Sequence, residues 1–493
     1  MRPVLDLLPL SLTSFRARVA TNQDLLEQVF MHCDPVTNRG DSNMLAKCAR
    51  VAHAFFQPAA KVLWEDLFDW SPILHVLWKS YKNDRWIGLI DDEQWARLEI
   101  YGPFVKRMEV LKEDDDDGPI GAGFYALVVR ARGQPIFPHL SRVGLVSLTH
   151  MRTYEPLFLL STGLRDVKFT LPVRDREPGE SYPCKMCRDF VIHEPDETMG
   201  PLLQLLHLQS PDLAALSINF DGSTYPEADV DDMRPIRFFS ALKHLHVEIG
   251  GMSLHALLQI CSEIKQLSSL SLHMSDDDLQ TPIRKNKANT PAPPPLRTLT
   301  DLKIRGHPAY AQTVLEYASP SPLQSLLLIG PLNTKGWKKA LDSLTKHFSD
   351  SVVTLGMTLY GQQRVRFADI GDKLHALPNL QQCFLEFVPE LSDSSQEPEK
   401  IPVSLTDDDI AKAARAWPRL RKFVLSCEAD EDAQDGPSAE SLDAFRQNCP
   451  DLTTLVVTSI EENAEIERKE LRDLNGDLDP DSGGGFAFIG YVY

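Results

Sequence analysis

The chain has 493 residues, of which 43% are hydrophobic and 25% are charged, and its formal net charge is −19. This composition excludes a wholly disordered protein, because it supplies ample apolar surface for burial. The negative charge argues against a nucleic-acid-binding protein, since phosphate groups are neutralised by a concentrated basic face. The length exceeds what one compact core usually holds, so we expect a repeat array or several domains.

The first 20 residues form an N-terminal segment without a predicted signal peptide. Its apolar run from Leu5 to Leu12 is interrupted by Asp6 and Pro9, and no cleavage site is evident. The chain has no uninterrupted apolar stretch of about 20 residues, so no membrane-spanning helix is expected. Its 8 cysteines are scattered and too few for a disulfide framework, which favours a reducing compartment, the cytoplasm or the nucleus.

Residues 21–80 are predicted to form a module of three short helices. The first begins at Thr21, with Asp24 three positions later as an imperfect capping box. The second carries apolar residues at three- and four-residue steps as far as Phe55. Pro58 is well placed as the first residue of the third helix. A module this small is expected to complete its apolar burial against a partner.

Residues 81–136 are expected to form a linker that contains an acidic loop. The clearest feature of this linker is the like-charge run from Glu113 to Asp117. Such a run is typical of a solvated loop, whereas a calcium site would need alternating ligands and a structured turn.

From residue 137 to residue 460 the chain repeats one phrase: an apolar residue, two others, an apolar residue, one other and an apolar residue. Its 11 copies, mostly 24 to 32 residues apart, begin at Leu140, Leu164, Leu213, Leu242, Leu267, Leu299, Leu323, Val352, Leu380, Leu420 and Leu452. Such a period predicts a solenoid, whose strands bury alternate residues by stacking on neighbouring repeats. We therefore expect an α/β fold, a leucine-rich-repeat solenoid with parallel strands inside and helices outside.

The segments that interrupt or follow the repeats are expected to lie outside the stack. The 49-residue step from Leu164 to Leu213 holds either a degenerate repeat, around Leu202 to Leu208, or an insertion at 173–200. Such an insertion, and those at 280–295 and 392–400, should form loops at the edges of the stack, where extra length costs little stability. Residues 461–493 are predicted to form a charged helix followed by an aromatic tail that begins at Phe486.

The helical module carries a recognisable series of residues: Asp24 to Phe30, Asp34-Pro35, Leu45 to Val51, Phe55 and Leu63-Trp64. In order and spacing this series resembles the F-box, and with the repeats behind it the chain is similar to fungal F-box proteins with leucine-rich repeats. One departure concerns the entry to the first helix. The family usually has Leu-Pro there, whereas this chain has Ala20-Thr21-Asn22, which weakens the expected partner contact at that point.

The resemblance implies that the chain is the substrate-recognition subunit of an SCF-type (cullin-RING) ubiquitin ligase. The module would dock on the Skp-type adaptor, which joins it to the cullin scaffold, and the repeats would bind the substrate protein. The implied adaptor-binding residues are Leu25, Leu26, Val29, Phe30, Leu45, Cys48, Val51, Phe55, Leu63 and Trp64. The alternative is a leucine-rich interaction scaffold not tied to ubiquitination, in which the helical module serves another partner or caps the first repeat. In a simpler interpretation, Leu26, Val29, Val51 and Trp64 only form a local core.

The residues that flank the last apolar position of each phrase lie on the opposite face of the strand. Early copies place polar residues there, such as Lys168 and Ser217, and from about the seventh copy this face becomes apolar. An exposed apolar strip normally marks an interface. The predicted substrate-binding residues are Lys303, Arg305, Leu327, Ile329, Phe384, Glu386, Val424 and Val456. In a second interpretation the aromatic tail folds back and covers this strip.

No motif in the chain indicates an enzyme, a metal site or a cofactor. Cys184 and Cys187 have the spacing of half a zinc knuckle, and His193 and His207 follow, but no second cysteine pair completes four ligands. Phosphate-binding glycine loops, metalloprotease helices and Gly-x-Ser-x-Gly elbows do not occur. We therefore expect a protein that acts by holding other proteins close together, without a catalytic residue of its own.

Overall fold

The computed structural model describes residues 22–110, 126–146, 159–172, 196–221, 233–249, 254–274, 295–389, 401–429 and 438–457, apart from short gaps at 34, 36–37, 69–70, 78–80, 83–84, 87–89, 128, 133, 160, 320 and 362. The chain divides into two compact units, residues 1–266 and 267–493. Several predicted features lie outside the described residues: segment 1–20, the run Glu113–Asp117, insertion residues 173–195, 280–294 and 392–400, the pair Cys184 and Cys187 with His193, and residues 461–493.

Three helices begin the first unit: α2 (Gln23–Phe30), α3 (Arg39–Val51) and α4 (His53–Glu65). The N-cap of α2 is Asn22 rather than Thr21. Its side chain accepts hydrogen bonds from the backbone N–H groups of Asp24 and Leu25. An asparagine side chain in this position satisfies donors that have no partner within the helix. Ala52 has an extended backbone and alone separates α3 from α4.

Phe55 and Pro58 do not lie where the sequence predicted them. Pro58 is inside α4 rather than at its first position, and Phe55, expected at the end of the second helix, also belongs to α4. The prediction was wrong because α3 ends at Val51 and a new helix starts directly afterwards. A proline inside a helix removes one backbone hydrogen bond, but Pro58 is buried and α4 packs against both α2 and α3. Tertiary packing outweighs the local preference here.

The first unit continues with parallel strands in the order β1-β4-β5-β6-β7-β8. These strands are β1 (Asp66–Leu67), β4 (Arg107–Val110), β5 (Arg142–Val146), β6 (Asp166–Pro172), β7 (Ala215–Asp221) and β8 (His244–Ile249). The other elements are α5 (Ser71–Val76), the antiparallel pair β2 (Tyr81–Lys82) and β3 (Arg85–Trp86), α6 (Asp92–Tyr101), η2 (Gly102–Phe104), α9 (Asp196–Gln209), η4 (Arg234–Phe238) and α11 (Leu254–Glu263).

The row of parallel strands begins before the predicted repeat boundary at residue 137. β1 pairs with β4 and β4 pairs with β5, so segment 81–136 contributes a strand to the row and is more than a linker. β4 belongs to an unrecognised copy of the repeated phrase, Val105-x-x-Met108-x-Val110. Val105 and Met108 are fully buried, and Met108 pairs with Val143 of the next copy.

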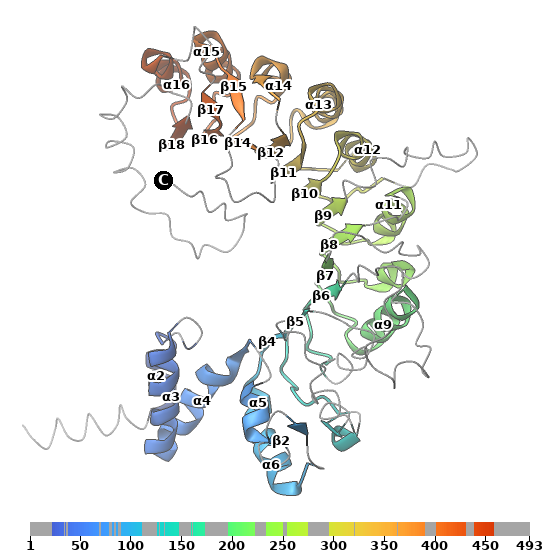
Figure 1. Cartoon of the computed structure of the whole chain (residues 1–493), viewed down its shortest axis with the longest axis vertical. Helices are drawn as coiled ribbons and strands as arrows, with labels where there is room; N and C mark the ends of the chain where they lie inside the picture. Colours follow the sequence, from blue (N-terminus) through green and yellow to red (C-terminus); the bar gives the residue numbers. More distant parts are fainter. Residues whose placement is uncertain are drawn as a thin grey trace, which may run out of the picture. The chain divides into compact units, whose positions relative to one another are not determined.

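The second unit has parallel strands in the order β9-β10-β11-β12-β14-β16-β18. These are β9 (Ser269–Met274), β10 (Asp301–Arg305), β11 (Ser325–Pro331), β12 (Thr354–Gly361), β14 (Gln382–Pro389), β16 (Lys422–Ser426) and β18 (Thr454–Val457). A small second sheet holds β13 (Val365–Arg366), β15 (Pro402–Ser404) and β17 (Glu428–Ala429). The helices are α12 (Pro308–Ala318), α13 (Thr334–Phe348), α14 (Ala368–Leu374), α15 (Asp407–Ala416), η6 (Ala439–Leu442) and α16 (Asp443–Asn448), and α12 to α16 lie along one side of the strand row (Figure 1).

Strand register aligns the phrase from one repeat to the next in this unit. The second apolar positions form the row Leu270, Leu302, Leu326, Leu355, Cys383, Phe423 and Leu455. The third apolar positions form the row Leu272, Ile304, Leu328, Met357, Leu385, Leu425 and Val457. All are at most 2% exposed except the two on β18, which are half-buried.

The burial of these rows explains why the repeats form strands at all. Each buried apolar side chain contributes about 1.5–3 kcal/mol relative to an exposed one, and a repeat obtains that burial from its neighbours. The α/β class and the stacked parallel strands predicted from the sequence are therefore confirmed. In the described part of the chain, no helix combines the length and the apolar character needed to cross a membrane.

Candidate functional site

The three N-terminal helices enclose a small core of their own. Its buried members are Leu26, Phe30, Leu45 and Ala59. Around them pack partly buried side chains, namely Cys33, Cys48, Ala49, Phe55, Val62 and Leu63. The rings of Phe30 and Phe55 meet edge to face with their centroids 6.2 Å apart, a favoured arrangement for aromatic pairs. The module thus has an internal core that holds the three helices together.

The predicted adaptor-binding residues divide between this core and the surface. Leu26, Phe30, Leu45 and Trp64 are buried, and Cys48, Phe55 and Leu63 are partly buried. Leu25, Val29 and Val51 are exposed, with 58% of Val29 and 74% of Val51 accessible to solvent.

The exposed apolar side chains follow one line on each of two helices. Leu25 and Val29 are four residues apart on α2 and so share one face of it, and Met44 and Val51, seven apart, share one face of α3. Met31, directly after α2, is also exposed. Neither methionine is among the residues predicted from the sequence, although the seven-residue step from Met44 to Val51 places the two on one helix face. These two exposed apolar helix faces are the module's candidate protein-binding site.

Trp64 lies in a different environment from the rest of the predicted set. Its ring stacks on the ring of Tyr101, with centroids 4.6 Å apart and planes inclined by 16°. Phe56 of α4 lies next to the same tyrosine, at 6.0 Å. Trp64 also lies three residues before Leu67 of β1, and the first two apolar positions of the repeated phrase are the same distance apart. Trp64 therefore packs α4 against α6.

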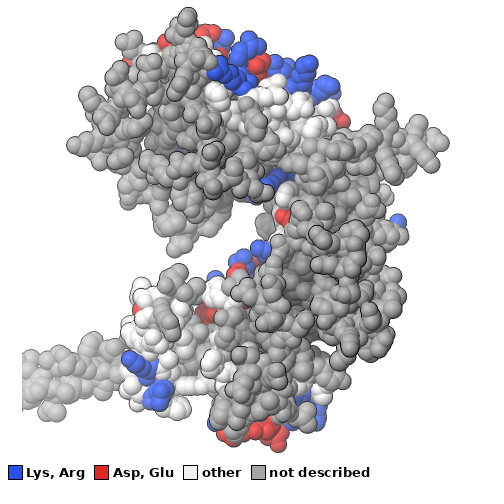
Figure 2. All heavy atoms as spheres, in the orientation of Figure 1, with Lys and Arg blue, Asp and Glu red and all other residues white. Residues whose placement is uncertain are grey.

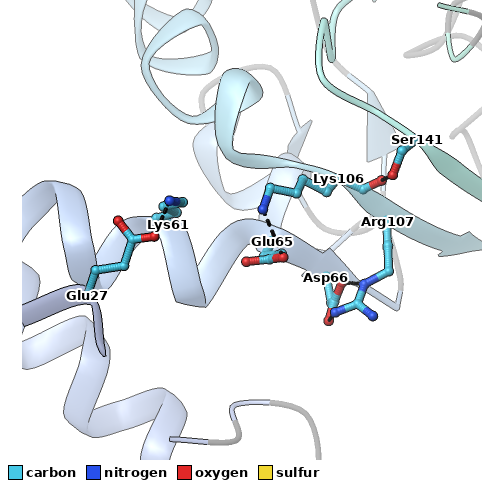
Figure 3. Close-up of polar contacts among 7 residues, drawn as sticks. All are labelled: Glu27, Lys61, Glu65, Asp66, Lys106, Arg107 and Ser141. Carbon is cyan, nitrogen blue, oxygen red and sulfur yellow. Dashed lines mark hydrogen bonds and ion pairs between the residues drawn. The ribbon is translucent and has the colours of Figure 1, made fainter. Parts of the chain in front are cut away.

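α4 continues into β1 without an intervening residue, and ion pairs fix the junction (Figure 3). Lys106 Nζ lies 3.1 Å from Glu65 Oε1. Both Nε and Nη2 of Arg107 donate to the two carboxylate oxygens of Asp66. The carbonyl of Lys106 in turn accepts the backbone N–H of Ser141 at 2.8 Å and its hydroxyl at 3.1 Å. Within the first unit the helical module is thus bonded directly to the strands.

A further ion pair links the first and third helices. Lys61 of α4 donates to Glu27 of α2, and both side chains are partly exposed (Figure 3). An exposed pair of this kind contributes at most about 1 kcal/mol.

The predicted substrate face lies on the strands of the second unit. Register places its residues in two neighbouring rows across β10, β11, β12, β14, β16 and β18. The first row is Lys303, Leu327, Gly356, Phe384, Val424 and Val456. The second row is Arg305, Ile329, Thr358, Glu386 and Ser426. The eight predicted residues are therefore brought together, with a basic pair on β10 and apolar side chains beyond it.

Individual side chains of this face differ in exposure. Arg305 is exposed, whereas Lys303, Ile329, Phe384, Glu386, Val424 and Val456 are half-buried. Leu327 is only 5% exposed, because it leans over Gly356 of the next strand. A Cβ added at Gly356 would lie 2.7 Å from Leu327 Cδ1. The Thr358 hydroxyl donates to Glu386 at 3.1 Å.

Among the described residues, no group of His, Cys, Asp and Glu side chains is arranged to hold a metal ion. Buried thiols occur in both units. Burial raises the pKa of Cys261 to about 12 and the pKa of Cys449 to about 11, and it raises the pKa of Cys383 as well. Because the thiolate is the reactive form, these three cysteines act as apolar packing residues.

The comparisons with known proteins found similarity in structure but not in sequence. No family model matches the chain, and no curated protein matches it in sequence. A chain of the crystal structure of the Rad7 and Elc1 complex in yeast aligns with 93% of this chain and 99% of its own length, at 14% sequence identity and a TM-score of 0.33.

Proposed function

We propose that the protein is the substrate-recognition subunit of an SCF-type ubiquitin ligase. The helices α2 to α4 would bind a Skp-type adaptor, which connects them to the cullin scaffold, and the repeat strands would bind the substrate protein. The observation that carries the proposal is the exposed apolar surface on a module that already has a core. Its support from the sequence is the F-box resemblance over the same residues.

The adaptor would contact the outward-facing side chains rather than the whole predicted set. Leu25, Val29 and Val51 are accessible, and Met44 is exposed on the same face of α3 as Val51. Burying a Val, Leu or Met side chain of this kind contributes about 1.5–3 kcal/mol each. Leu26, Phe30 and Leu45 would act indirectly, because they hold the helices in position.

The protein would act by proximity. A bound substrate and the ligase's activated ubiquitin would share one assembly, so their effective concentration rises without any reacting group from this chain. The ion-paired junction between α4 and the first strands supports this role, because a firmly attached module keeps the adaptor in a fixed orientation on the first unit.

The second candidate function is an interaction scaffold that is independent of ubiquitination. It is favoured by Trp64, which is buried and stacks on Tyr101 of α6, so that the module packs against the element that follows it, as a capping block would do. A capping block, however, does not require Val29 and Val51 to project into solvent.

The two functions are separated by capture of a purified Skp-type adaptor on the full chain. We expect the double variant Val29→Asp/Val51→Asp to lose at least about 100-fold in affinity, since two buried apolar contacts are replaced by unpaired charges. Leu208→Asp is the matched control, because Leu208 is an equally exposed apolar residue, 73% accessible, on α9. Failure of the unmodified chain to bind the adaptor would leave the scaffold function.

A further inference from the structure

The substrate face of the second unit ends in an apolar strip formed by Leu327, Phe384, Val424 and Val456. Register places them on β11, β14, β16 and β18, in one line with Gly356 of β12. A line of this kind crosses the strands rather than following one of them. An occupant would therefore lie perpendicular to the strands, with its successive side chains on successive repeats.

A pair of cations stands at one end of this strip. Lys303 and Arg305 are two residues apart on β10 and share one face of the strand. Among the described residues, neither forms an ion pair with a carboxylate, whereas Lys338 and Lys373 of the same unit pair with Asp369 and Asp342. Burial, and then the charge of Arg305, lower the pKa of Lys303. A partly desolvated cation beside a second one is a site for an anionic group.

The chain carries a segment with the matching order of groups. Residues 458–493 lie outside the described residues, and the segment 477–493 belongs to them. It begins with carboxylates, continues through three glycines and ends in aromatic and apolar side chains. These groups are Asp477, Asp479 and Asp481, then Gly483 to Gly485, then Phe486, Phe488, Ile489, Tyr491, Val492 and Tyr493.

The spacing of these groups fits the strand row. Adjacent strands are about 4.8 Å apart, so β10 and β14 are separated by three steps, or about 14 Å, and β14 and β18 by about 10 Å. Five residues from Asp481 to Phe486 span at most about 17 Å, and three residues from Phe488 to Tyr491 at most about 10 Å. A carboxylate at the Lys303–Arg305 pair would therefore place the aromatic residues over Phe384 and the strands beyond it.

The chain between the strand row and this segment also has a suitable length. Val457 ends β18, five steps or about 24 Å from β10. The charged helix predicted over residues 461–474 would span about 21 Å at 1.5 Å per residue, so with the flexible residues at its two ends the stretch from Val457 to Asp477 would span about 25 Å on average. A linker whose average span equals the separation of its two sites gives an effective concentration on the order of millimolar.

From these observations we propose that residues 477–493 bind in cis across β10 to β18. The aspartates pair with Lys303 and Arg305, and the aromatic side chains cover Leu327, Phe384, Val424 and Val456. A substrate protein that uses this face must displace the segment. Proteins with low affinity for this face would therefore not bind to it. This inference concerns the second unit alone and holds whether or not the helical module binds an adaptor.

The test uses a fluorescein-labelled synthetic peptide of residues 477–493 and the full chain. The full-chain variant Phe486→Ser/Phe488→Ser should release the strip. We expect the peptide to bind this variant at least about tenfold more tightly than the unmodified chain, because the native segment competes at a millimolar effective concentration. Adding Lys303→Glu/Arg305→Glu should weaken peptide binding to the released variant by about tenfold, since two charge pairs are lost.

Charge reversal on α13 provides the matched control. Lys335 and Lys339 are exposed on this helix, where Lys and Arg side chains gather over α13 and α14 (Figure 2). Lys335→Glu/Lys339→Glu should leave peptide affinity unchanged, and thermal melting checks that every variant is folded. Equal peptide binding by the unmodified and the released chains would overturn the proposal, as would an equal loss with the α13 variant. Either result would leave the strip to a separate protein. The binding assay contains no adaptor, so its result does not depend on whether the proposed ligase function is correct.

Discussion

The helical module and the strand row of the second unit bury their apolar side chains in different ways. In the row, register sets Leu326 against Leu302 on one side and Leu355 on the other, so each repeat is completed by a near copy of itself. The module has no copy to stack on, and its helices close around a few residues while Val29 and Val51 project outward. A repeat can therefore complete its burial within the chain, whereas the module leaves some of its apolar side chains exposed.

The largest expected effect separates the middle of the strand row from its last strand. Leu326→Ala should lower the free energy of unfolding of the second unit by about 2–5 kcal/mol, because it leaves a cavity between two neighbouring repeats. Leu455→Ala should cost clearly less, since Leu455 is half-buried. Denaturant unfolding followed by circular dichroism measures both. Equal losses would contradict the view that each interior repeat depends on two neighbours.

A second comparison tests the division of the helical module into core and surface. Leu45→Ala should destabilise the module by about 2–5 kcal/mol, since Leu45 is fully buried. Val51→Ala should change its stability by less than about 0.5 kcal/mol and still weaken adaptor capture. Thermal melting and capture on the same preparations give both values. A large stability loss at Val51 would mean that this side chain belongs to the core.

A smaller effect is expected where the substrate face lacks a side chain. Gly356→Ala places a methyl group against Leu327 Cδ1 and should cost about 1–3 kcal/mol through overpacking. The double variant with Leu327→Ala should recover part of that loss, because the two positions are in contact. Unfolding free energies of the two single variants and the double variant give the coupling. Strict additivity would show that Leu327 does not lean over Gly356.

The smallest effect is expected at the junction between α4 and the strands. A double-mutant cycle of Asp66→Ala and Arg107→Ala should yield a coupling of about 0.2–1 kcal/mol, because the arginine side of this pair is exposed to solvent. Repeating the cycle at high salt should reduce the coupling further. A coupling near zero at low salt would show that the covalent continuity of α4 and β1, rather than the ion pair, holds the module in place.

The repeat architecture was predictable because its information is local and periodic. A phrase of six residues fixes which side chains point inward, and the register of the second unit follows it at every strand. The copy at Val105 to Val110 obeyed the same rule and was missed because 35 residues separate it from the copy at Leu140. The internal position of Pro58 was not predictable from its neighbours, since it depends on packing against α2 and α3.

The candidate sites were predictable in position but not in detail. Spacing along α2 identified one apolar stripe, yet it could not distinguish Leu26, which enters the core, from Val29, which does not. Leu327 was expected on an exposed face, and its burial depends on the missing side chain of Gly356, which is 29 residues away in sequence and adjacent only through register. Contacts of this type depend on the pairing of strands, so they cannot be predicted from the sequence of a single repeat.

The buried thiols allow the opening of each unit to be measured by cysteine alkylation. Cys261 belongs to the first unit and Cys383 to the second, and both are fully buried with a raised pKa. A short pulse of an alkylating reagent can mark such a sulfur during an opening event, when solvent reaches it and its acidity returns toward that of free cysteine. Mass spectrometry of the peptides that contain Cys261 and Cys383, after increasing pulse times, would then give the opening rate of each unit, without the need to introduce a cysteine by mutation.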